Sequence, residues 1–175
     1  MEPAPVPAID PNAPIVQRLS DQPAPPIETV HWNPALRRLL GYWHERCLGR
    51  NMPSRADIDP IDLGGELLPH VMILDHEEAS GRFRYRLLGT AVVRAREGLA
   101  VPDPTGHYVD EVAHGMPREW LLAGPSRAIA ERRPIYDRGQ YDLGNSKVSR
   151  YERLSLPLSD GAGKAIKVLV GFFVS

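Results

Sequence analysis

The 175-residue sequence has only one cysteine, Cys47, and no stretch that approaches the roughly 18 consecutive apolar residues of a membrane span. A lone cysteine cannot form an internal disulfide or a multi-cysteine zinc or iron-sulfur site, so we expect no metal centre of that kind. The first residues also lack the basic start and the apolar run of a secretion signal. We therefore expect a soluble protein of the reducing cytoplasm that does not associate with membranes.

An excess of charge of either sign is also missing. The sequence has 21 Lys and Arg residues against 22 Asp and Glu residues, which gives a formal net charge of -1. Such an even balance supplies no long-range attraction to a phosphate backbone, so we expect no nucleic-acid partner. Apolar residues make up 42% of the chain, which is enough for one domain with a proper core.

Prolines are distributed unevenly along the chain. Eight of the 18 prolines fall within the first 30 residues, at Pro3, Pro5, Pro7, Pro11, Pro14, Pro23, Pro25 and Pro26. Few large apolar residues accompany them to offset the entropy cost of ordering the chain. The composition predicts a proline-rich flexible arm over residues 1–30 and a single domain over residues 31–175.

Helical periodicity begins directly after the arm. Asn33 is suited to an N-cap and Pro34 to the first helical position, where no backbone donor is needed. Apolar residues then recur at three- and four-residue steps: Leu36, Leu39, Leu40, Trp43 and Cys47. This spacing predicts an amphipathic helix over 33–49. Its apolar stripe either packs on the core of the domain or pairs with the same helix of a second copy, which would make a homodimer.

Alternating apolar residues predict five strands. The first two, over 71–74 and 83–87, are joined by a turn at 79–81; the other three lie at 135–143, 148–158 and 165–174. In the second strand Phe83, Tyr85 and Leu87 alternate with arginines, so these three side chains are expected to face the core. The alternation in the last strand is typical of a sheet covered on one side. Strands followed by helices and more strands indicate an α+β domain.

Short helical segments are predicted between the strands. They lie at 61–63, at 91–96 and, as one longer helix, at 117–132. Gly124 and Pro125 interrupt the longest of them, and proline removes a helix hydrogen bond, so this helix is expected to kink or split there.

Residues 52–60 form a proline-bounded stretch that contains Arg55, Asp57 and Asp59. The pattern predicts a rigid, charge-paired loop, in which Asp59 caps the short helix at 61–63 and Pro60 takes its first position. Such a loop can tie the entry segment to the sheet or present a polar surface to a partner, and we favour the structural role.

Several short motifs accompany this order of elements. They are the 52–60 stretch, Leu68-Pro69, Arg86-Leu87-Leu88-Gly89-Thr90, Gly98, Asp103 with Thr105-Gly106, and Leu156-Pro157-Leu158. Over roughly residues 33–174 the chain resembles the PAS domain superfamily and, more narrowly, is similar to a bacterial family of small stand-alone PAS proteins. The resemblance implies a PAS-like five-stranded antiparallel sheet with short helices on one face, an N-terminal flanking helix, and a pocket between the concave face and the helices.

The resemblance also implies a function in signalling by binding. We expect a non-enzymatic sensory or adaptor domain that binds a small molecule, a protein partner, or both. Because the last predicted strand ends at Ser175, we expect regulation in trans of a separate effector, such as a signalling kinase or regulator. Some relatives hold haem, flavin or a metabolite, and others use the sheet only for protein contacts. The resemblance therefore leaves the cofactor of this chain unknown.

Two sets of residues are candidates for binding. His107, His114, Tyr85 and Thr90 are candidate ligand-binding residues, and either histidine could be an axial haem ligand. The candidate partner surface consists of Arg55, Asp57 and Asp59 of the loop together with the strand residues Arg84 and Arg86.

The arginines of the second predicted strand, Arg82, Arg84 and Arg86, have two interpretations. They could bind an acidic partner, or they could form a solvated strand face matched by Glu77, Glu78 and Glu152, which we favour.

The runner-up function is a small α+β enzyme of the cone-shaped isomerase type. Such an enzyme uses a carboxylate in an apolar cavity to move a proton, and the candidates are Asp103, Asp110 and Glu111. An enzyme predicts a carboxylate aimed into the cavity, whereas an adaptor does not.

Overall fold

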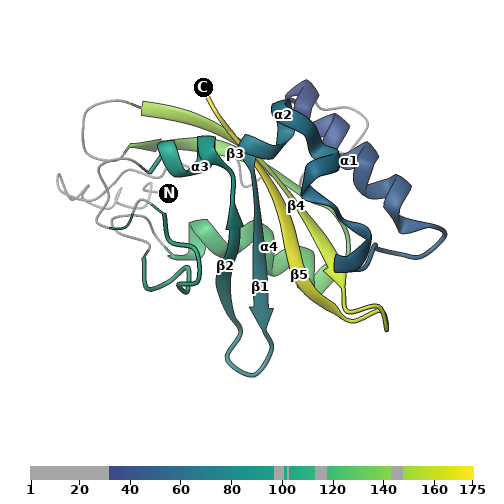
Figure 1. Cartoon of the computed structure of the whole chain (residues 1–175). Helices are drawn as coiled ribbons and strands as arrows, with labels where there is room; N and C mark the ends of the chain where they lie inside the picture. The colour runs from purple at the N-terminus through teal and green to yellow at the C-terminus, as the bar shows by residue number, and fades with distance from the viewer. Residues whose placement is uncertain (1–31, 97–100, 102, 113–117, 143–147) are drawn as a thin grey trace, which may run out of the picture.

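A computed structural model of the chain describes residues 32–96, 101, 103–112, 118–142 and 148–175 (Figure 1). The arm predicted over 1–30, the motif residue Gly98 and the candidate ligand His114 lie outside the described residues.

Five strands form one antiparallel sheet, as the sequence predicted. They are β1 (Val71–Glu77), β2 (Arg82–Leu88), β3 (Ile135–Asp142), β4 (Val148–Ser159) and β5 (Ala165–Val174). Their spatial order is β2-β1-β5-β4-β3, so the first and last strands of the chain pair in the middle of the sheet. The predicted α+β class with a PAS-like sheet is confirmed.

Helices and helical turns connect and cover the strands. They are α1 (Pro34–Cys47), η1 (Arg55–Asp57), η2 (Pro60–Leu63), α2 (Gly64–Leu67), η3 (Leu68–His70), α3 (Thr90–Arg94) and α4 (Arg118–Glu131). Both predicted caps are present: the Asn33 side chain accepts from the Ala35 amide at 2.8 Å, and Asp59 accepts from the Ile61 amide at 2.9 Å. None of the described helices is both long and apolar enough to cross a membrane.

The sheet is covered on both faces, so the expectation of cover on one side was wrong (Figure 1). On one face Leu36 and Leu39 of α1 pack in a core with Leu169 of β5. On the other face Val168 and Val170 of β5 pack with residues of α4. A Cβ atom on Gly171 would lie 2.6–2.7 Å from these two α1 leucines, so the glycine allows α1 to approach β5 closely. The strand is apolar on both sides, and the regular alternation of its larger residues concealed this.

The predicted orientation of the Leu87 side chain was wrong because the β1–β2 hairpin contains a bulge. The register shifts between Ile73 and Leu74, so that Leu74 pairs with Tyr85 while Ile73 pairs with Leu87. Arg86 is the extra residue, and side chains beyond it change face. Leu87 therefore packs against the core on the α1 side, whereas Tyr85 belongs to the core on the other face.

The α4 helix continues through Pro125 without a break, so the expected split does not occur. Proline has no amide proton, which leaves the Leu121 carbonyl without its partner in the helix. The Arg153 Nη1 atom of β4 donates to that carbonyl at 2.9 Å. A hydrogen bond from the sheet thus replaces the one that proline removes.

Two motifs of the resemblance meet beside β1. A Cβ atom on Gly89 would lie 2.3 Å from the backbone oxygens of both Leu68 and Pro69, so only glycine fits this position. The Gly89 amide also donates to the Val71 carbonyl at 2.7 Å. These motif residues are therefore explained by packing of the backbone.

Candidate functional site

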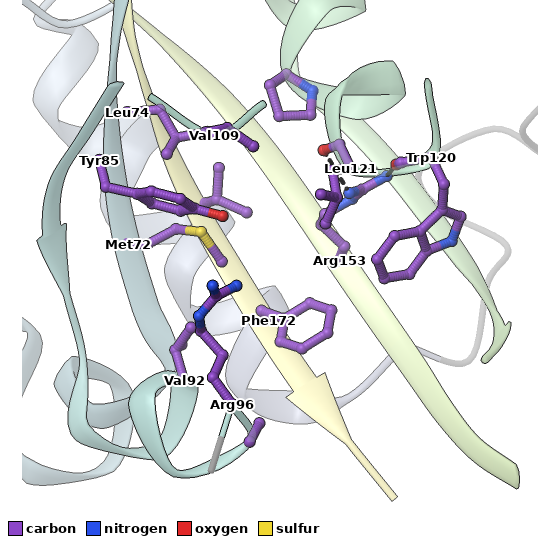
Figure 2. A pocket seen from close by; sticks show the side chains of 13 residues that line it. Met72, Leu74, Tyr85, Val92, Arg96, Val109, Trp120, Leu121, Arg153 and Phe172 are labelled. Atoms are coloured by element: carbon purple, nitrogen blue, oxygen red, sulfur yellow. Dashed lines mark hydrogen bonds between the residues drawn. The ribbon is translucent and has the colours of Figure 1, made fainter. Parts of the chain in front are cut away.

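A small cavity lies between the sheet face opposite α1 and the helices α3 and α4 (Figure 2). Its volume is about 70 Å³. Most lining residues are apolar, namely Met72, Leu74, Val92, Ala95, Val109, Leu121, Pro125, Val170 and Phe172. The others carry polar or charged groups and are Tyr85, Arg96, Trp120 and Arg153. Because a single water needs roughly 10–15 Å³ of such space, the cavity can hold several waters or a small organic ligand.

The local periodicity of each element explains which side chains reach the cavity. Val170 and Phe172 are two apart on β5 and share a face, as alternate residues of a strand do. Val92, Ala95 and Arg96 follow helical three- and four-residue spacing through α3 and the turn after it. The cavity is thus lined by one face of the sheet, one side of α3 with the turn after it, and residues of α4.

Arg96 is the unusual member of this wall because it is 6% exposed and has few partners. Its Nη2 atom donates to the Val112 carbonyl at 3.0 Å and, more weakly, to the Val101 carbonyl at 3.4 Å. Its Nε atom is buried without a hydrogen bond. Within the described part of the chain no carboxylate forms an ion pair with Arg96.

Tyr85 lies opposite Arg96, with its hydroxyl directed into the cavity (Figure 2). The Arg96 Cζ atom is 5.7 Å from the centre of the tyrosine ring. The side chain is 5% exposed, and burial raises the pKa of Tyr85 above its ordinary value, so the hydroxyl stays protonated at neutral pH. It makes no hydrogen bond to another described residue and is available as a donor.

Arg153 also lines the cavity, but its charge is neutralised within the chain. Its side chain is 5% exposed and forms an ion pair with Asp137 at 2.9 Å. Its Nη1 and Nη2 atoms donate to the carbonyls of Leu121 and Trp120 at 2.9 and 3.0 Å (Figure 2). Arg153 therefore joins α4 to β4 and has little capacity left for a ligand.

Of the residues predicted to bind a ligand, the structure places Tyr85 in the cavity wall. Thr90 begins α3 and is exposed, and His107 is exposed in the turn before Tyr108; neither lines the cavity. The described lining includes no histidine, so a haem with His107 as its axial ligand does not fit this cavity. In the described part of the chain no three His, Cys, Asp or Glu side chains are grouped so that they could hold a metal ion.

The 52–60 loop is tied to the sheet, although its charges pair differently from the prediction. Asp57 accepts from the Ser54 amide and hydroxyl at 2.7 Å and pairs with Arg50 at 2.6 Å. The Ser54 hydrogen bonds and Arg50 lower the pKa of Asp57. Arg55 instead donates to the Ile58 carbonyl at 2.7 Å. The Ser159 amide donates to the Pro53 carbonyl at 2.8 Å, which fixes the loop to the end of β4.

The arginines of β2 differ in what they contact. Arg82 pairs with Asp110 at 3.0 Å and with Glu111 at 2.7 Å, and its Cζ atom lies 3.6 Å from the centre of the Tyr108 ring. Arg84 is exposed and donates to the Tyr108 hydroxyl at 2.7 Å, whereas Arg86 is exposed at the bulge. The carboxylates that neutralise Arg82 come from the segment after Tyr108 and not from the predicted Glu77, Glu78 and Glu152.

The carboxylates proposed for an isomerase lie outside the cavity. Asp103 is exposed and accepts from the Thr105 amide and hydroxyl, while Asp110 and Glu111 pair with Arg82. The Thr105 hydrogen bonds lower the pKa of Asp103, and the hydrogen bond from Arg82 lowers that of Glu111. A general acid or base in an apolar cavity needs the opposite shift.

Arg96 and Arg153 were absent from the predicted site. The available sequence signal was weak and existed for Arg96 alone, a charged residue that follows the apolar Val92 by four residues in a predicted helix. Arg153 alternates with Leu154 and Leu156 and shares its strand face with Ser155, so the alternation predicted an exposed side chain. A buried arginine at such a position needs an anion or several carbonyl oxygens close by.

The comparisons with known proteins agree with this architecture. A family model described as a PAS domain matches residues 32–97, the segment from α1 through α3 that includes Arg96, and no curated protein matches the chain. The narrower similarity to small stand-alone PAS proteins stays a prediction. The family match over residues 32–97 and the five-stranded antiparallel sheet with its short helices together support a PAS-like domain.

Proposed function

We propose that this PAS-like domain is a non-enzymatic sensory module that binds a small molecule in its cavity and thereby regulates a separate effector protein. The observation that carries the proposal is the apolar cavity itself, into which two polar side chains, Tyr85 and Arg96, are directed (Figure 2). Small-molecule sites are typically concave and apolar, with a few polar groups that fix the orientation of the ligand.

Ligand binding can regulate an effector only if the ligand has different affinities for two conformations of the domain. Arg96 lies in the turn after α3 and donates to the Val112 carbonyl. A ligand that binds the guanidinium therefore acts both on this turn and on the segment that contains Val112. Arg84 and Arg86 are exposed on β2 near this segment, and Arg84 bonds to Tyr108. We expect the effector, such as a signalling kinase or regulator, to contact this side of the domain.

A homodimer through α1 and a cytoplasmic location both stay predictions. The apolar stripe of α1 is buried within its own chain, so a dimer would have to use the opposite side, which exposes Arg37, Arg38, Gly41, His44 and Glu45.

Filling the cavity tests the proposal. The variant Ala95→Leu adds a side chain from the cavity wall, and Ala91→Leu, one turn earlier on α3 and outside the lining, is its matched control. Native mass spectrometry of the purified protein should find a bound small-molecule mass in the wild type and in Ala91→Leu that Ala95→Leu lacks. Quantitative affinity purification should find at least one partner whose recovery changes with Ala95→Leu alone. Equal small-molecule masses and equal partner recovery in all three proteins would contradict the proposal.

A further inference from the structure

We infer that the ligand of this cavity is a small monocarboxylate whose charged group is bound by Arg96 and Tyr85. The inference rests on the proposed function, because it assumes that the cavity is a ligand site, and it adds the chemical class of the ligand.

The first argument is the uncompensated charge of Arg96. The side chain is 94% buried, given its 6% exposure, and its Nε–H group faces no acceptor. The described residues offer it two carbonyl oxygens, at Val112 and Val101, and no carboxylate. Burying a charge without a counter-charge is costly, so buried arginines are normally paired. An anion in the cavity would supply the missing counter-charge.

The second argument is the convergence of donors. The Arg96 guanidinium and the Tyr85 hydroxyl are both directed into the cavity, and the Arg96 Cζ atom lies 5.7 Å from the centre of the tyrosine ring (Figure 2). A guanidinium presents its N–H groups in a planar fork that matches the two oxygens of a carboxylate. The protonated tyrosine adds a further donor. Together they form a site for one carboxylate group.

The third argument is the charge balance of the rest of the cavity. The other charged lining residue, Arg153, is neutralised by Asp137 and bonded to two helix carbonyls. Among the described lining residues one positive charge therefore remains, which a monoanion neutralises and a dianion would exceed. The remaining wall is apolar, with Met72, Leu74 and Phe172 among its members, and suits a hydrocarbon body. The volume of about 70 Å³ limits that body to a short aliphatic chain or a single ring.

Isothermal titration calorimetry with paired ligands tests the inference. Butyrate and benzoate are titrated into the full chain, and butyramide and benzamide serve as neutral analogues of nearly the same shape. The variants are Arg96→Met, Tyr85→Phe and, as a matched control, Arg94→Met, which removes an exposed arginine of α3. Each protein is first checked by circular dichroism for native folding.

We expect at least one of the two acids to bind the wild type about tenfold or more tightly than its amide. Arg96→Met should abolish that preference, Tyr85→Phe should reduce it, and Arg94→Met should leave it unchanged. If Arg96→Met does not fold, the comparison of acid with amide on the wild type and on Tyr85→Phe still decides the matter.

Two other outcomes would overturn the inference in distinguishable ways. Equal binding of acids and amides, with no effect of Arg96→Met, would leave the cavity as a ligand site and remove the carboxylate specificity. Absence of binding by all four compounds would reject small monocarboxylates, while the proposed function would still be judged by the comparison of Ala95→Leu with Ala91→Leu.

Discussion

Two buried arginines line one cavity, and they differ in the groups that their guanidinium atoms contact. Arg153 is paired with Asp137 and donates to two carbonyls, whereas Arg96 donates to carbonyls alone. The paired arginine is part of the scaffold because its bonds connect α4 to the sheet. The unpaired arginine is available to an anion, and this difference assigns a separate role to each.

Removal of Arg153 should destabilise the domain strongly. The variant Arg153→Met removes the ion pair of Asp137 and the side-chain donor to the Leu121 and Trp120 carbonyls, and breaking a buried pair in this way costs roughly 3–5 kcal/mol. The free energy of unfolding from urea titrations measures the loss. Arg150→Met, an exposed position on the same strand, is the control and should change it by less than about 0.5 kcal/mol. Equal effects of the two variants would contradict the scaffold role.

The 52–60 loop should make stability depend on pH through Asp57. The pKa of Asp57 is lowered in the folded state, chiefly by the Ser54 hydrogen bonds. The unfolded chain therefore binds the proton more readily, so the contribution of Asp57 is present above its ordinary pKa of about 3.9 and is lost as the pH falls through the lowered value.

The thermal midpoint of Asp57→Asn, measured from pH 7 to pH 2.5, tests this expectation. The variant should have a lower thermal midpoint than the wild type at pH 7, and this difference in midpoint, the gap, should shrink as the pH falls. Asp62→Asn, which removes an exposed partner of Arg46, should show only a small gap throughout. A gap for Asp57→Asn that is constant across this range would exclude the proposed linkage.

At the scale of elements, α4 packs on the sheet at Gly124. A Cβ atom there would lie 2.7 Å from the Asp137 Oδ2 atom and 2.9 Å from the Ser155 Oγ atom. The glycine therefore permits the close approach, and the arginine of β4 then bonds to the carbonyl that Pro125 leaves free. A glycine that weakens an isolated helix is here needed for its contact with the sheet, and the sheet satisfies the carbonyl that Pro125 leaves free.

Substitution of two helical glycines by alanine should have opposite effects. Gly124→Ala should destabilise the domain by about 1–3 kcal/mol, because overpacking outweighs the gain in helix propensity. Gly41→Ala, on the exposed side of α1 with no atom within 4 Å of the added carbon, should stabilise it by about 0.5–1 kcal/mol. Chemical denaturation measures both values, and a gain in stability for Gly124→Ala would show that the contact is looser than described.

Local patterns allowed most elements to be predicted. The α1 helix and its Asn33 cap follow from short-range spacing and capping chemistry, and the strands follow from apolar alternation bounded by turn residues. The bulge at Arg86 and the unbroken α4 could not be predicted in this way. Both depend on pairing with another element, namely the register with β1 for the bulge and the hydrogen bond from Arg153 of β4 for the helix.

The candidate site was predictable only in part for the same reason. Tyr85 was expected to face the core, and it lines the cavity. Whether Arg96 has a carboxylate partner depends on where the carboxylates of several elements lie. Asp110, for example, pairs with Arg82. No local pattern in the sequence reports such pairings.

At the scale of the whole molecule, ligand binding should stabilise the folded domain. A ligand that binds only the folded state adds about 2.7 kcal/mol at a concentration of 100 Kd. For a domain of this size each kcal/mol raises Tm by roughly 2–4 °C, so a saturating carboxylate should raise it by roughly 5–10 °C. Differential scanning fluorimetry with benzoate and benzamide at equal concentrations measures this shift. A shift of the same size with the amide would contradict the preference for an anion.

The most direct test observes the guanidinium itself. In ¹H–¹⁵N spectra of the full chain, the Arg96 Nε–H resonance, assigned with Arg96→Met, should move and saturate as the monocarboxylate is added, because the guanidinium gains a counter-charge in the cavity that it lines. The resonances of Arg94 and Arg150 should stay in place, since both side chains are exposed and neither lines the cavity. An Arg96 resonance that does not move, while the ligand shifts resonances elsewhere in the domain, would contradict the account.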